Sequence, residues 1–334
     1  MYYIYIIKMP YITTIIENKY MSVGGFGHIF YDVLSSYIIS HLFNLTYVYS
    51  PIISLGNEHH TGINFGSRND DIVWDDFLKF NKDETTIEDI LHLPLKKIEI
   101  NLCKPFKSIN ITKLEKFIKS YDDNTLFILT NNNRVYLNEL YYINSDIYVK
   151  VFHNLKTKLG HLKYPNKNDN KIKIAIHIRR GDWDWQPLSY NIEFIKLWKS
   201  LIIDKNIDYE INIYSLGKQK QLDEIKNKLD CLDNNIIYYF NTDVYSTFKD
   251  IYNADIVIGG HSSFSKIITL FSNNLFIYLP YNDGVIQALG VNNEFKLNYL
   301  GNYPELFDIE NRIETDIYCK KNKELIIQKI QTFM

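Results

Sequence analysis

A hydrophobic run near the middle of the chain ends in residues that are suited to binding an anion. The run covers residues 174–178, and it delivers His177, Arg179 and Arg180 at its end. Ligands of parallel α/β folds bind at the carboxyl ends of the strands. Only five of the 37 lysine and arginine residues are arginines, so two adjacent arginines indicate a need for a guanidinium group, which holds phosphate oxygens with two parallel hydrogen bonds. The alternative is a structural ion pair with Asp182 or Asp184.

His177 precedes Arg179 by two residues and therefore lies on the same face of a regularly paired strand. A packed core histidine is the alternative to a ligand contact.

Two glycine-containing segments also stand between an expected strand and an expected helix. The first contains Gly25 and Gly27, and the second runs from Gly259 to Ser263. Glycine lets the backbone approach a ligand closely, and the first turn of a helix offers unpaired N–H groups to an anion. A tight turn explains the first segment equally well, and helix capping explains the serines of the second. The chain contains no GxxxxGK[ST] sequence, which disfavours a P-loop nucleotide hydrolase.

The elements that position these segments alternate between short β-rich runs and amphipathic stretches, which is typical of an α/β fold with parallel sheets. The expected strands are residues 4–7, 46–49, 126–130, 172–178, 209–214, 236–240, 255–258 and 275–279. The expected helices are residues 28–43, 218–232, 246–253 and 263–271. A polar, proline-containing segment at residues 161–173 is the expected linker. A chain of 334 residues accommodates about two domains, which we expect at residues 1–165 and 171–334.

Composition excludes several classes of protein. The chain has 37 basic and 39 acidic residues without a basic cluster, which disfavours a nucleic-acid binder. The three cysteines lie far apart, so neither a zinc module nor a disulfide framework is expected, and a reducing compartment is favoured. The apolar N-terminus is interrupted by Lys8 and Pro10, well short of the ~20 residues of a membrane span. We therefore expect a soluble, cytoplasmic protein.

Three motifs together resemble a known family. The sequence from His177 to Asp182, His-Ile-Arg-Arg-Gly-Asp, is similar to the HxRRxD signature of the GT-B fucosyltransferases, which include the α1,2-, α1,6- and protein O-fucosyltransferases. The glycine-rich segment at residues 24–27 resembles the GGxGN opening of the α1,2 branch, and residues 261–265 resemble its NSSFS element. The motifs follow the family's order over about residues 20–280.

The resemblance implies a GT-B fold, in which two Rossmann-like domains face each other across a cleft. It also implies an inverting transfer of L-fucose from GDP-fucose to a hydroxyl of a glycan acceptor, with no metal or other cofactor. By this analogy Arg179 holds the β-phosphate and stabilises the leaving diphosphate, Arg180 and Asp182 complete the motif, and His177 lies near the guanine or ribose. The other donor-binding positions that it implies are Gly25, Phe26, Gly27, His261, Ser262, Ser263 and Phe264. Without a signal anchor, the chain resembles a bacterial or viral enzyme more than a Golgi one.

The chain departs from the family pattern at the base and at the nucleobase. His28 replaces the family's asparagine and is a candidate base for the acceptor hydroxyl, with helix capping or packing as the alternative. Leu216, Gly217 and Thr247 occupy positions where the family has acidic residues, so Asp243 or Asp250 is the candidate for reading the guanine. These departures leave two alternatives open: a GT-B transferase for another nucleotide sugar, and a non-catalytic module that binds a GDP-sugar or a glycan.

The segment from Asp182 to Trp185 contains a DxD sequence, the metal–diphosphate element of GT-A enzymes. We disfavour a metal site, because the two preceding arginines already supply positive charge. Trp183 and Trp185 are candidates for stacking on a sugar or on guanine, with packing as the alternative.

Overall fold

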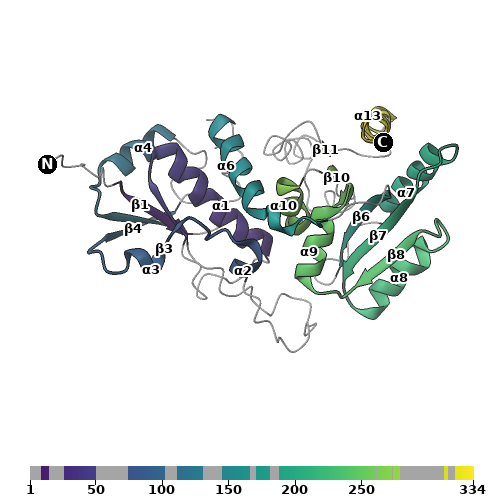
Figure 1. Ribbon diagram of the computed structural model, residues 1–334, viewed down its shortest axis with the longest axis horizontal. Coiled ribbons are helices and arrows are strands. Elements are labelled where there is room, and N and C mark those ends of the chain that lie inside the picture. The colour runs from purple at the N-terminus through teal and green to yellow at the C-terminus, as the bar shows by residue number, and fades with distance from the viewer. Residues whose placement is uncertain are drawn as a thin grey trace, which may run out of the picture. The chain divides into compact units, whose positions relative to one another are not determined.

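The chain consists of two compact α/β units (Figure 1). The computed structural model describes residues 9–14, 26–49, 74–101, 111–130, 145–165, 171–180, 188–260, 262–272, 274–278, 312–314 and 320–334. Of these, the residues up to Leu159 form the N-terminal unit and those from Gly160 onward form the C-terminal unit. The division therefore falls just before the polar segment at residues 161–173 that we expected to be the linker.

The N-terminal unit is built on a parallel sheet with the strand order β3-β2-β1-β5-β4. Its strands are β1 (Tyr11–Thr14), β2 (Thr46–Tyr49), β3 (Thr85–Thr86), β4 (Lys96–Asn101) and β5 (Thr125–Thr130). Its helices are α1 (Phe26–Phe43), α2 (Trp74–Leu78), α3 (Ile87–Ile90), α4 (Ile111–Lys119) and α6 (Ser145–Lys158), after which a 3-10 turn (Leu159–Leu162) leads toward the C-terminal unit. The carboxyl ends of β1, β2 and β5 therefore share one edge of the sheet.

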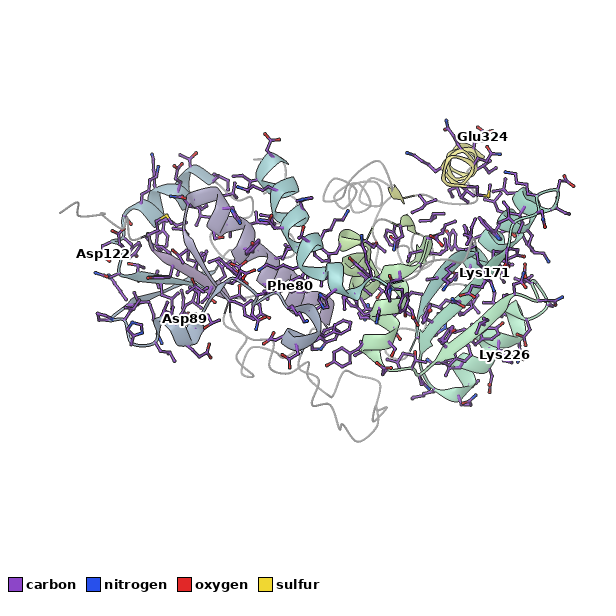
Figure 2. The ribbon with its side chains drawn as sticks, in the orientation of Figure 1. Phe80, Asp89, Asp122, Lys171, Lys226 and Glu324 are labelled. Atoms are coloured by element: carbon purple, nitrogen blue, oxygen red, sulfur yellow. The ribbon has the colours of Figure 1, made fainter. Side chains whose placement is uncertain are left out.

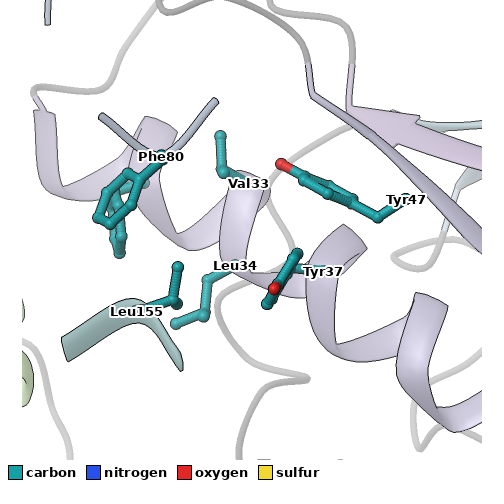
Figure 3. A pocket seen from close by; sticks show the side chains of 7 residues that line it. Val33, Leu34, Tyr37, Tyr47, Phe80 and Leu155 are labelled. Carbon is teal, nitrogen blue, oxygen red and sulfur yellow. The ribbon is translucent and has the colours of Figure 1, made fainter. Parts of the chain in front are cut away.

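Helix α1 packs on one face of this sheet and against α6. It leaves a small apolar pocket, shown in Figure 3, whose lining is Phe30, Val33, Leu34, Tyr37, Tyr47, Phe80 and Leu155. Tyr37 donates its hydroxyl to Glu84 at 3.1 Å, and the Lys158 ammonium pairs with the same carboxylate at 2.5 Å. The pocket presents neither a cation nor an amide for binding an anion, so we assign it to helix–sheet packing.

The C-terminal unit is built on a six-stranded parallel sheet with the order β11-β10-β9-β6-β7-β8. Its strands are β6 (Ile172–Arg179), β7 (Tyr209–Leu216), β8 (Ile236–Phe240), β9 (Ile256–Gly259), β10 (Leu275–Tyr278) and β11 (Arg312–Glu314). Its helices are α7 (Ser189–Ile202), α8 (Gln219–Leu229), α9 (Val244–Asn253), α10 (Ser263–Phe271) and α13 (Lys320–Phe333). Counted from β6, this is the 3-2-1-4-5-6 order of the Rossmann fold. The expected α/β class, with two Rossmann-like units, is confirmed.

The two faces of this sheet differ in character. Ile174, Ile176 and Ile178 of β6 are fully buried in a core that α7, α8 and α13 complete. The alternate residues of β6, including His177 and Arg179, point to the opposite face, where α9 and α10 pack. Strand periodicity thus removes the aliphatic residues from water on one side and carries the polar residues on the other.

Most of the expected elements are confirmed, with shifts at their ends. The bounds of β2, β8 and α10 agree with the sequence prediction, and β6 extends one residue farther, to Arg179. Residues 4–7 lie outside the described residues, and the first described strand is β1 at residues 11–14. Among the boundaries that differ, α1 begins at Phe26 instead of His28, so Phe26 and Gly27 belong to its first turn.

Candidate functional site

The C-terminal sheet reverses its strand order next to β6. The chain passes from β6 to β7 on one side and later returns to place β9 on the other side. In open α/β sheets, the carboxyl edge at such a reversal is the ligand-binding position. Strand β6 ends at Arg179, β9 ends at Gly259, and His177 is in register with Gly259. Two of the three segments that the sequence singled out therefore meet at this edge.

Gly259 allows α10 to pack tightly over the end of β9. A Cβ atom at this position would lie 2.9 Å from Cε2 of Phe276 and 3.0 Å from Oγ of Ser265. Both neighbours are buried, so neither can move away easily. The glycine is therefore required by close packing, and it fixes the start of α10 at the sheet edge.

The N-terminus of α10 carries the serines of the second glycine segment. Ser262 is the N-cap residue, with an extended backbone, and its N–H donates to the Gly260 carbonyl at 2.7 Å. Within the described part of the chain, its side chain makes no capping hydrogen bond. This result argues against side-chain capping as the explanation for Ser262. The backbone N–H groups of the first turn and the positive end of the helix dipole are suited to an anion.

His177 lies beside this helix end, with one ring nitrogen sealed from solvent. Its Nδ1 atom is buried, and among the described residues it has no hydrogen-bond partner. The centroids of the His177 and Phe264 rings are 5.7 Å apart. Burial, with a smaller contribution from the charge of Arg179, lowers the pKa of His177 to about 4. The imidazole is therefore neutral near pH 7 and has an unsatisfied polar atom, which a bound ligand or water would satisfy.

We expect His177 to make the protein less stable in acid. The pKa is 6.5 when the chain is unfolded and about 4 when it is folded, so the unfolded state gains a proton first as the pH falls, and the native state loses stability between these values. When the pH is lowered from 7.5 to 4.5, the free energy of unfolding of His177→Phe should fall by about 2–3 kcal/mol less than that of the wild type. Urea unfolding at both pH values measures the difference, and equal losses would contradict the assignment of a buried, neutral histidine.

The side chains of Arg179 and Arg180 do not form a single anion-binding group. Arg180 is 6% exposed, and its Nη1 donates to the backbone carbonyl of Arg179 at 3.1 Å. A hydrogen bond from Lys228 chiefly lowers the pKa of Glu224 on α8, and the charge of Arg180 also contributes. Arg180 therefore lies on the side of α8, whereas Arg179 acts on His177 on the opposite face. Successive side chains along an extended chain point to opposite faces of the sheet, and the Arg179 side chain lies on the face on which α10 packs.

The two candidates for reading a nucleobase both have local structural contacts. Asp243 caps α9 by accepting a hydrogen bond from the N–H of Ser246 at 2.8 Å. Asp250 accepts from the Tyr164 hydroxyl at 2.5 Å. Burial chiefly raises the pKa of Tyr214, and the charge of Asp250 and a hydrogen bond to it contribute. The contacts of these two carboxylates are structural, and they give neither carboxylate a specific role in binding guanine.

The opposite end of β6 provides a contrast. Lys171, labelled in Figure 2, lies before the first residue of the strand and pairs with Glu210 at 3.3 Å. Lys171, at the amino end, is thus neutralised by a carboxylate on the neighbouring strand, which is the arrangement of a structural ion pair.

Several expected site residues lie outside the described residues, so the structure gives them no geometry. They are Gly25, Asp182, Trp183, Asp184, Trp185 and His261. Gly27 and His28 lie in the first turn of α1, and Ser263 is the first residue of α10, but the side chains of His28 and Ser263 are not described. Where the structure does describe side chains, no group of three or more His, Cys, Asp or Glu residues is arranged to hold a metal ion.

A buried pair at the carboxyl edge of the N-terminal sheet was not predicted from the sequence. Tyr49 is the last residue of β2, and its hydroxyl donates to a carboxylate oxygen of Asp75 in α2. Tyr49 is 1% exposed and Asp75 is 8% exposed. The available signal was a tyrosine at the end of an expected strand. Nothing in the sequence distinguishes Asp75 from its neighbour Asp76, because their difference in burial arises only on folding.

Of the comparisons with known proteins, the one with solved structures gives matches. No protein-family model matches the chain, and no curated protein sequence matches it. Among solved structures, POFUT1 in complex with GDP is similar over 78% of this chain and 94% of its own, with 13% identity and a TM-score of 0.41. Fucosyltransferase NodZ from Bradyrhizobium is similar over 79% of this chain and 92% of its own, with 11% identity and a TM-score of 0.35. Because these values are low, the assignments below rest on the residues themselves. In the described part of the chain, no helix is long and apolar enough to cross a bilayer.

Proposed function

We propose that the protein is an inverting, metal-independent glycosyltransferase of the GT-B class that transfers L-fucose from GDP-fucose to a glycan hydroxyl. One observation carries this proposal. Arg179, the sealed Nδ1 atom of His177 and the start of α10 converge at the carboxyl edge where the C-terminal sheet reverses its strand order. This is the position at which a Rossmann-like unit receives a nucleotide, and the groups present there favour a diphosphate.

The proposed chemistry places positive charge where negative charge develops. The acceptor oxygen forms a bond to C1 of fucose while the bond from C1 to the β-phosphate oxygen breaks, and its electron pair leaves with GDP. Arg179 stabilises the departing phosphate with charge-assisted hydrogen bonds, and the N–H groups at the start of α10 share the task. Because the charge grows as the bond breaks, these donors favour the transition state over the bound donor. In this scheme the guanidinium takes the place of a metal.

The remaining expected residues extend the proposed donor site. Ser262 and Ser263 hold phosphate oxygens through the helix terminus, and His177 contacts the nucleoside through its unsatisfied nitrogen. Gly25 and Gly27 are further candidates for contact with the pyrophosphate, with Gly27 in the first turn of α1, and Asp182 completes the motif. His28, in the first turn of α1, is the proposed base that takes the proton of the acceptor hydroxyl.

A second candidate is a transferase of the same class that uses another nucleotide sugar. The observation in its favour is that Asp243 is committed to capping α9 and Asp250 to binding Tyr164. Among the described residues, these two candidate carboxylates already accept other hydrogen bonds, which leaves less reason to prefer guanine over another base.

Release of GDP from GDP-fucose, with water as the acceptor, tests the proposed activity without knowledge of the natural glycan. We expect slow, EDTA-insensitive release of GDP by the wild type. Arg180→Lys retains the buried charge on the side of α8 and should retain activity, whereas Arg179→Lys should lose most of it, because lysine cannot form two parallel hydrogen bonds. Tight donor binding without any GDP release would instead identify a non-catalytic module.

A further inference from the structure

The turn between β8 and α9 presents an exposed hydroxyl whose proton is directed back into the protein. The side-chain oxygens of Thr242 and Thr247 lie 2.9 Å apart, and Thr247 Oγ1 donates to the backbone carbonyl of Asp243 at 2.9 Å. A threonine hydroxyl has one proton and two lone pairs. Because Thr247 gives its proton to the carbonyl, Thr242 donates to Thr247 and keeps its own lone pairs for a ligand. Thr242, which is exposed, thus offers a hydrogen-bond acceptor.

We propose that Thr242 is a specificity-determining residue for the nucleobase, whose oxygen accepts a hydrogen bond from the N1–H or the 2-amino group of guanine. This inference rests on the proposed function, which places the diphosphate of the same nucleotide at Arg179. Asp243 and Asp250, the two carboxylates considered for this task, already accept other hydrogen bonds. The acceptor on Thr242 serves the base in their place.

The first argument is the position of the turn relative to Arg179. Arg179 is in register with Leu216, so the ends of β6 and β7 lie side by side. Two hydrogen bonds join the turn after β7 to the turn after β8: the N–H of Gly217 donates to Asn241 Oδ1 at 3.0 Å, and Asn241 Nδ2 donates to the Gly217 carbonyl at 3.2 Å. Thr242 follows directly. It therefore lies two strands, or about 10 Å, along the same edge from Arg179, a separation that a nucleoside diphosphate spans.

The second argument is the apolar surface beside Thr242. Leu216, the last residue of β7, is 36% exposed, and Val244, the first residue of α9, is 39% exposed. Ligand sites combine apolar side chains with a few polar groups that fix orientation. Covering these two side chains with the face of a planar base removes apolar surface of both partners from water. A base in this position presents its edge to the turn that carries Thr242.

The polarity of the acceptor discriminates between the two purines. Guanine has hydrogen-bond donors at N1 and at its 2-amino group, whereas adenine has an acceptor at N1 and lacks the 2-amino group. Thr242 therefore pairs with guanine, but its lone pairs face another lone pair when the base is adenine. A neutral hydrogen bond changes affinity by about 5-fold, and an unmade one adds a penalty, so we expect GDP to bind about 10-fold more tightly than ADP.

Calorimetric titration of the whole chain with GDP and with ADP tests this proposal, because the two nucleotides differ only in the base. Thr242→Val keeps the shape of the side chain and removes its oxygen, so the affinity for GDP should fall about 5-fold while that for ADP does not fall. Thr242→Ser keeps the hydroxyl and should keep the wild-type ratio of the two affinities. Thr157→Val removes an exposed hydroxyl from α6 and should also behave as the wild type.

A second variant tests the direction of the hydroxyl and not its presence. Thr247→Val removes the group that accepts the Thr242 proton, so the Thr242 hydroxyl can rotate and donate to N1 of adenine. The affinity for ADP should then rise towards that for GDP. A purely structural contact between the two threonines would instead lower both affinities by the same factor, which would overturn the inference.

The remaining outcomes separate this inference from the proposed function. If the wild type binds neither GDP nor GDP-fucose, the proposed function fails and the inference fails with it. If the wild type binds GDP-fucose and Thr242→Val keeps the wild-type ratio of GDP to ADP affinity, Thr242 does not select the base, and the proposed function stands. Equal affinity of the wild type for GDP and ADP also overturns the inference alone.

Discussion

Replacing Arg179 with alanine is expected to weaken the binding of GDP-fucose by about 100-fold. Arg179 ends β6 at the strand-order reversal, on the same face as His177 and α10. Hydrogen bonds to charged groups contribute about 1.5–3 kcal/mol each, so the loss of two hydrogen bonds to phosphate oxygens costs about 3 kcal/mol of binding free energy. Isothermal titration with GDP-fucose measures the change.

A control for this prediction lies on the same strand. Lys173 is a cation near the amino end of β6, at the edge opposite the proposed site. Lys173→Ala removes the same charge from the same strand, and its donor affinity should remain within about two-fold of the wild type because screening weakens charges beyond about 10 Å. Equal losses in the two variants would show that Arg179 acts through net charge and not through contact.

Gly259→Ala is expected to destabilise the C-terminal unit and impair its site together. The added methyl group would lie 2.9 Å from the Phe276 ring, which is itself buried. Overpacking of this type costs about 1–3 kcal/mol, which corresponds to a fall in melting temperature on the order of 5 °C. Because Gly259 is in register with His177 and precedes α10, the displacement should also weaken GDP binding. Thermal unfolding with and without GDP measures both effects.

Gly160 provides the matched comparison. A Cβ atom at Gly160 would meet no other heavy atom within 4 Å. Gly160→Ala should therefore leave the melting temperature almost unchanged and GDP binding intact. A loss in Gly259→Ala no larger than that in Gly160→Ala would contradict the close packing of α10 on the end of β9.

The C-terminal unit was largely predictable from the sequence, because its strands are short, apolar runs bounded by polar turns. β8 and α10 have the expected bounds, and the end of β6 differs by one residue. Helix α7 was missed, although Phe194, Ile195 and Trp198 face the core. It follows directly after the segment with the charged motif, and no element was predicted between the strands at residues 172–178 and 209–214.

The N-terminal unit was less predictable. Strand β4, with the sequence KKIEIN, alternates lysine, isoleucine and glutamate, and was not expected to be a strand. β3 has only two residues, and it is defined by its pairing with β2 and not by its composition. Its position depends on contacts distant in the sequence, which local periodicity does not report.

The candidate site was predicted in its residue types but not in its arrangement. His177, Arg179 and Ser262 were singled out, and the sheet order brings their segments together. The separation of Arg179 from Arg180 onto opposite faces follows from strand alternation, yet the adjacent arginines were interpreted as one anion-binding unit. The Tyr49–Asp75 pair was not foreseen, because it joins residues 26 positions apart through a hydrogen bond that exists only in the folded unit.

We propose that this chain binds a guanosine diphosphate sugar through Arg179 without a metal. The most direct test of this claim is calorimetric titration of the wild type and Arg179→Ala with GDP-fucose, GDP-mannose, UDP-glucose and GDP, all in the presence of EDTA. We predict that GDP and GDP-fucose bind the wild type selectively and that Arg179→Ala loses this binding. Preference for UDP-glucose, a requirement for a divalent cation, or equal binding by the variant would contradict the claim.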